Sequence, residues 1–113
     1  MASTPLTPIV SAFDLTTSWE TIYQVSDSLS RIGVDAAVFN NYTASNVSYS
    51  VRIVQTGAAG VLSEIITEKT IRAQGNDLAS ALIGQSVISG GIIQAKASVN
   101  SSVSASITAT TFT

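Results

Sequence analysis

Residues 31–54, RIGVDAAVFNNYTASNVSYSVRIV, decide the fold class of this chain. In the second half of the stretch, apolar and other residues alternate: one face holds Val47, Tyr49, Val51 and Ile53, and the other holds Ser48, Ser50, Arg52 and Val54. This alternation predicts a β-strand, because successive side chains of a strand point to opposite faces. The first half alternates in the same way from Ile32 to Phe39. The polar heptapeptide NNYTASN at 40–46 predicts a hairpin loop between the two strands.

Further strands are predicted along the chain at a spacing of roughly ten residues. They cover 19–25, 61–71 with an early irregularity, 85–89, 92–99 and 103–112. In the first of them the expected shared face is Trp19, Thr21, Tyr23 and Val25. Residues 56–60 are expected to form a flexible connection, and 90–91 and 100–102 to form turns. Residues 76–84 could form one turn of helix, capped by Asp77 and ended by Gly84.

This pattern has no long helix and predicts an all-β fold, an antiparallel two-sheet β-sandwich. Periodicity does not choose between a jelly-roll and an immunoglobulin-like topology. The length of 113 residues fits a single sandwich domain, which we place at 16–113.

The N-terminal segment 1–15 carries both prolines and lacks a clear period, so we expect an extended N-terminal arm. The arm could be a loose terminus, or it could lie across a neighbouring subunit and hold it. In the second case the expected partner contacts are in the arm and in two exposed loops: Pro5, Leu6, Pro8, Ile9, Tyr42 and Gly57.

The composition argues against catalysis and against several partner classes. The chain has no His and no Cys, which excludes Ser-His-Asp and Cys-His catalysis and the usual zinc sites. Glu64 and Glu68 lie roughly 13 Å apart on one strand, too far for glycoside hydrolysis. We therefore expect no enzyme, with no catalytic, cofactor-binding or metal-binding residues. Because the net charge is −2 and no basic cluster occurs, nucleic acid is not an expected partner. No apolar window is long enough for a membrane span, so no membrane is expected either.

Three aromatic residues allow a second interpretation. Trp19, Tyr23 and Tyr49 could form a platform on which a sugar stacks, as in a carbohydrate-binding or adhesin-like module. Their alternation with polar residues favours core packing instead.

Three successive segments resemble those of small virion structural proteins of tailed bacteriophages. They are the stretch at 31–54, IITEKTIRAQGNDLASALIGQSVISGG at 65–91, and a closing hairpin, IIQAKASVNSSVSASITATTF, at 92–112. The resemblance implies a β-sandwich capsid decoration or cement protein that reinforces the shell through symmetric intersubunit contacts. A neck, tail or fibre-attachment protein is the alternative within the virion. The implied partners are the major capsid protein or other virion proteins, in a homo-oligomer (a trimer is possible) or a symmetric array, after assembly in the host cytoplasm.

Overall fold

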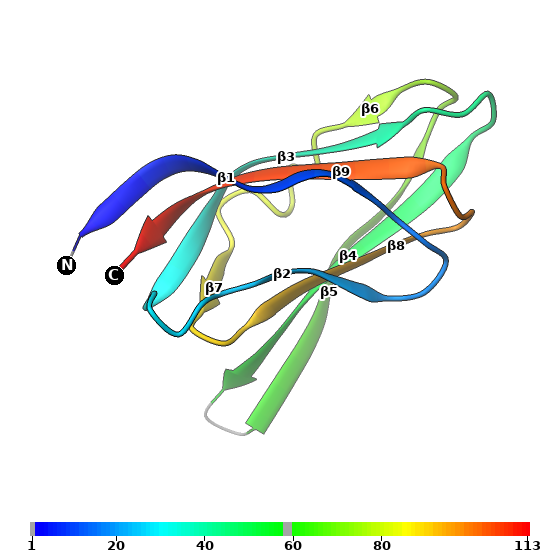
Figure 1. Cartoon of the computed structure of the whole chain (residues 1–113). Coiled ribbons are helices and arrows are strands. Elements are labelled where there is room, and N and C mark those ends of the chain that lie inside the picture. Colours follow the sequence, from blue (N-terminus) through cyan, green and yellow to red (C-terminus); the bar gives the residue numbers. More distant parts are fainter. Residues whose placement is uncertain (1, 58–59) are drawn as a thin grey trace.

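The computed structural model describes residues 2–57 and 60–113, which form nine strands in two layers (Figure 1). The strands are β1 (Ser3–Asp14), β2 (Glu20–Gln24), β3 (Arg31–Asn41), β4 (Val47–Gly57), β5 (Gly60–Ile71), β6 (Asn76–Asp77), β7 (Ser86–Ile88), β8 (Ile92–Ala97) and β9 (Val103–Phe112). This confirms the antiparallel two-sheet β-sandwich. Among the described residues no helix could cross a membrane.

The strand order identifies the topology. The first sheet, sheet A, runs β1-β9-β3, with β6 and β7 paired to the two ends of β3, and the second, sheet B, runs β2-β8-β4-β5. If β6 and β7 are counted as two pieces of one interrupted strand, the chain pairs inward from its ends: β1 with β9, β2 with β8, β3 with β6 and β7, and β4 with β5. This pairing is a jelly roll, one of the two topologies that the sequence left open.

The two hairpins expected at 31–54 and 92–112 are not formed. β3 and β4 lie in opposite sheets, and so do β8 and β9. The connection after β3 crosses between the layers because the buried Asn41 side chain holds it. Its amide Nδ2 donates to the carbonyls of Ser45, Ile71 and Arg72, and its Oδ1 accepts from the backbone N–H of Thr43. The turn is thereby joined to the end of β5, a strand of sheet B.

The N-terminal segment is extended as expected, but it is not an arm outside the sandwich. β1 pairs with β9 from Ser3–Phe112 to Asp14–Ser104, with three shifts of register. These shifts, with positive φ angles at Leu6 and Ala12, break the alternation that would have identified a strand. The two prolines are tolerated because β1 is the edge of its sheet. Val10 and the following Leu15 are buried in the core.

The helical turn expected at 76–84 is also wrong. β6 is followed by two consecutive tight turns, in which Leu82 N–H donates to the Ala79 carbonyl (2.9 Å) and Gln85 N–H to the Leu82 carbonyl (3.1 Å). Gly84 has a positive φ of 88°, which ends the second turn. Ala79 and Leu82 are buried, so the segment closes one side of the core without forming a helix.

Strand β5 confirms the irregularity expected early in 61–71. A register shift separates the pairs Val51–Thr67 and Arg52–Ile65, and Ile66 packs against the core at this point. The connection expected at 56–60 falls partly outside the described residues, because β4 ends at Gly57, β5 begins at Gly60 and 58–59 are not described.

The core fills the space between the sheets. Its centre is a stack of Phe39 from β3 on Tyr49 from β4, with ring centroids 4.1 Å apart and planes 10° from parallel. Around β2 the expected shared face of Trp19, Thr21, Tyr23 and Val25 is wrong: Val25 is buried together with Ile22 of the other face, whereas Trp19 is on the outer side of sheet B. A register shift between Thr21 and Tyr23 changes the alternation there.

Candidate functional site

The residues expected to contact partners lie in three separate places. Pro5, Leu6 and Pro8 are exposed on β1, while Ile9 is half-buried against the core. Leu6 is the most prominent of them, with 70% of its surface exposed. The structure therefore brings the β1 residues together.

Tyr42 and Gly57 lie apart from this group and from each other. Tyr42 follows β3, and its backbone N–H donates to Ser102, at the end of β9 opposite to the one that pairs with Ser3. Gly57 is the last residue of β4, which runs past the end of its pairing with β8 at Val54. The six residues do not form one surface.

Tyr42 has a structural contact that the sequence did not indicate. Its hydroxyl donates to the Asp14 carboxylate at 2.5 Å, linking the loop after β3 to the end of β1. This hydrogen bond, with some desolvation, raises the pKa of Tyr42. A partner that bound here would meet a loop already fixed to sheet A.

The three aromatic residues of the carbohydrate interpretation do not share a surface. Tyr49 is buried in the core, where its hydroxyl donates to Asp77. Burial, reinforced by this hydrogen bond, raises the pKa of Tyr49 well above its usual range. Tyr23 is half-buried, and Trp19 alone of the three is on the outer face of sheet B. The platform of three rings is not present.

Among residues 2–57 and 60–113, no group of three or more Asp or Glu side chains could hold a metal ion. Among the side chains that the structure describes, every buried nitrogen and oxygen has a hydrogen-bond partner.

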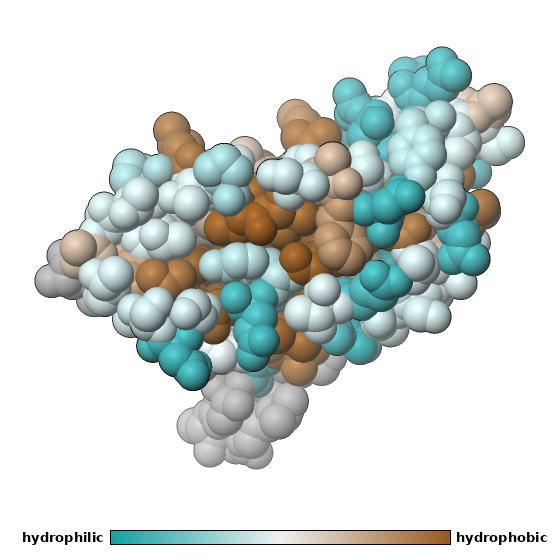
Figure 2. All heavy atoms as spheres, in the orientation of Figure 1, coloured by the Kyte–Doolittle hydropathy of each residue, from teal (hydrophilic) through white to brown (hydrophobic). Residues whose placement is uncertain are grey.

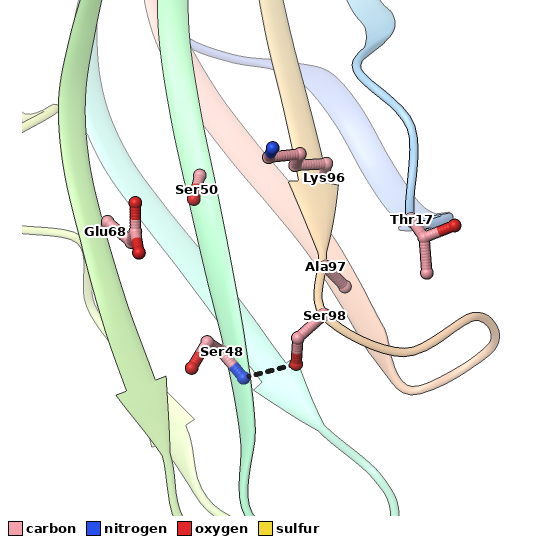
Figure 3. A pocket seen from close by; sticks show the side chains of 7 residues that line it. All are labelled: Thr17, Ser48, Ser50, Glu68, Lys96, Ala97 and Ser98. Carbon is pink, nitrogen blue, oxygen red and sulfur yellow. Dashed lines mark hydrogen bonds between the residues drawn. The ribbon is translucent and has the colours of Figure 1, made fainter.

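A polar hollow of about 270 Å³ lies on the outer face of sheet B (Figure 3). Its lining residues are Thr17, Ser48, Ser50, Glu68, Lys96, Ala97 and Ser98. The strand register explains it. Ser50 of β4 pairs with Glu68 of β5 on one side and with Lys96 of β8 on the other. The short side chains of Ser48 and Ser50 on β4 form the floor of the hollow. The longer side chains of Glu68 and Lys96 on the two flanking strands form its walls.

Neighbouring contacts hold the walls and the floor. The Lys96 ammonium lies over the Trp19 ring, 4.9 Å from its centroid, and the Arg52 guanidinium lies 4.2 Å from the same centroid. Such contacts between a cation and an aromatic ring fix the direction of a long side chain. At the floor, the Ser48 N–H donates to the Ser98 hydroxyl (3.0 Å), and the Ser48 hydroxyl bonds with that of Thr70.

Figure 2 shows hydrophobic atoms in the middle of one face, in the opening between the layer that carries β1 and β9 and the layer that carries β2 and β8. Ile9, Phe13 and Tyr23 pack against the core as partly buried residues.

The sequence shows the alternation of Ser48 and Ser50 with Tyr49, but it does not show the hollow. The hollow depends on which residues of β5 and β8 flank them, and that is set by the sheet order. In the sequence, Glu68 and Lys96 are isolated charged residues, and nothing there indicates that they flank Ser50.

Comparison with known proteins identifies the fold. No protein-family model and no curated protein matches the sequence. A chain of the T13 viral particle of infectious bursal disease virus matches 98% of this chain, with 9% identity and a TM-score of 0.54. A chain of the Gx strain of that virus matches 98% at 12% identity, with a TM-score of 0.41. This chain spans 31% of the length of each. At such low identity, the first likeness shows a shared fold.

Proposed function

We propose that the chain is a non-enzymatic structural protein of a virion, and more specifically a capsid decoration or cement protein of a tailed bacteriophage. The observation that carries the proposal is the jelly-roll strand order, in a sandwich that matches part of a viral-particle chain over nearly all of its own length. The bacteriophage and the decorating role rest on the resemblance of residues 31–112 to small virion proteins of that class.

The surface supports a role in an array. Only 11% of the residues are charged. The outward positions of β9 carry hydroxyls instead: Ser104, Ser106, Thr108 and Thr110. A surface with few charges can be packed against neighbours without a large desolvation cost. Small contacts of this kind suffice in a symmetric shell, where several neighbours hold each copy.

The contact that we propose for the shell is the exposed side of β1, with Pro5, Leu6, Pro8 and Ile9. β1 is an edge strand, so one side of its backbone is not paired within its own sheet. The partner is the major capsid protein or a second copy of this chain. Tyr42 and Gly57 are proposed as contacts to other neighbours, since Tyr42 is at the end of β9 opposite to Ser3 and Gly57 is on sheet B.

Adding the purified protein back to particles that lack it tests this contact. Leu6→Glu places a charge at the exposed position, so we expect at least tenfold weaker binding to particles, measured by co-sedimentation, with an unchanged melting temperature. The matched control is Val99→Glu, an exposed residue (51%) in the turn after β8. Equal binding of the wild type and both variants would contradict a role of β1 in attachment. Deletion of 1–15 is not a suitable test, because it also removes Val10 and Leu15 from the core.

A further inference from the structure

Three polar groups in the hollow on sheet B have no hydrogen-bond or ion-pair partner among the described residues. They are the Ser50 hydroxyl, the Glu68 carboxylate and the Lys96 ammonium. The hydrogen bonds around the hollow use Ser48, Ser98 and Thr70 instead, and the ion pair seen in the described part of the chain joins Lys69 and Asp77. Figure 3 shows Glu68 and Lys96 reaching from opposite sides toward Ser50.

These three groups offer complementary hydrogen-bonding roles in one row. The carboxylate accepts, the ammonium donates, and the serine hydroxyl between them can do both. The row is short, because Glu68 and Lys96 are separated by two strand spacings, roughly 9.5 Å between their backbones. A ligand that matches the row must carry several groups that both donate and accept within a few ångströms.

From this geometry we propose that the hollow binds a neutral saccharide. Adjacent hydroxyls of a sugar ring donate to a carboxylate and accept from an ammonium at the same time. Glu68 would repel an anionic ligand and Lys96 would repel a cationic one. A neutral ligand is repelled by neither wall. Trp19 acts as a positioning residue, because its ring holds the Lys96 ammonium.

The first experiment applies the full chain to an array of immobilised oligosaccharides that includes neutral and acidic glycans. The affinity for the best neutral sugar is then measured in solution from the fluorescence of Trp19, the single tryptophan of the chain. We expect binding to at least one neutral glycan. Glu68→Gln and Lys96→Met should each weaken it about tenfold or more, since the first replaces a charged acceptor with a neutral one and the second removes the charged donor.

Glu64→Gln is the matched control, because Glu64 is an exposed carboxylate of the same strand that does not line the hollow. It should leave the affinity unchanged. The proposal is overturned if the wild type binds no neutral glycan, if it binds acidic glycans alone, or if Glu64→Gln weakens binding as much as Glu68→Gln.

This inference does not depend on the proposed virion role. Sugar binding is measured on the isolated chain, whereas the virion role is measured on particles. Failure of either experiment therefore leaves the other proposal standing.

Discussion

Asn41 holds the chain where it passes from one sheet to the other. Its fully buried amide bonds to three carbonyls and to the turn that follows. Asn41→Ala leaves these groups buried without partners, so we expect the free energy of unfolding to fall by about 2–3 kcal/mol in urea denaturation. Asn40→Ala, one position away and only half-buried, should change it by less than about 0.5 kcal/mol. Similar losses in both variants would show that the side chain of Asn41 does not hold the crossing.

Tyr49 should make the stability depend on pH in alkaline solution. Its pKa in the folded chain is raised above the ordinary value of 10.0, chiefly by burial. The contribution of the protonated hydroxyl is therefore complete below pH 10 and is lost as the pH rises further, since the unfolded chain then releases the proton more readily. The free energy of unfolding, measured from pH 8 upward, should fall above about pH 10.

Tyr49→Phe keeps the stack on Phe39 but removes the ionisable group. We expect a smaller fall above pH 10 in this variant, whereas Tyr42→Phe, at an exposed hydroxyl, should retain most of the wild-type fall. An identical pH profile for the wild type and Tyr49→Phe would show that Tyr49 is not the residue responsible.

The residues at the floor of the hollow show how much of the site can be predicted from the sequence. Alternation places Tyr49 inward and Ser48 and Ser50 outward, and the structure agrees. It gives no information on their lateral neighbours, Glu68 and Lys96, which come from distant parts of the chain. Trp19 could not be placed because the register shift after Thr21 is a property of the pairing with β8.

Among the elements, strands were easier to predict than their partners. The strand at Val103–Phe112 has the predicted bounds, since its alternation is regular. The same alternation is compatible with pairing to either neighbour or to neither. The sequence therefore did not reveal that the strands within 31–54, and those within 92–112, lie in opposite sheets and do not form hairpins. The crossing after β3 is set by the side-chain bonds of Asn41, which a polar loop sequence does not reveal.

The pairing of β1 with β9 is open to a direct covalent test, because the chain has no cysteine. Thr4 and Thr111 are register partners on these strands. The double variant Thr4→Cys with Thr111→Cys should form a disulfide within one chain on oxidation. The oxidised protein should unfold at a higher denaturant concentration than the reduced one. The corresponding gain in the free energy of unfolding is expected to be about 2–4 kcal/mol.

The single variant Thr4→Cys is the control and should show no such difference as a monomer. Disulfides found solely between two chains of the double variant would contradict the pairing, since they would place β1 on a neighbouring copy. In that case β1 would be the extended arm, expected from the sequence, that lies across a neighbouring subunit and holds it.

At the scale of the whole molecule, the two ends of the chain lie together. Thr113 N–H donates to the Ala2 carbonyl, and Figure 1 shows both termini at the same end of the sandwich. The opposite end carries Tyr42 and the crossing at Asn41. The outer face of sheet B, with its hollow, points away from sheet A. A copy attached through β1 would therefore leave this face open to other ligands.

The copy number of this chain in purified virions tests the proposed function most directly. Quantitative mass spectrometry against the major capsid protein gives the ratio. A decoration protein should be present in hundreds of copies, in a ratio fixed by the symmetry of the shell. A few to a few dozen copies would contradict decoration and indicate a neck, tail or fibre position, and absence from particles would contradict the virion role itself.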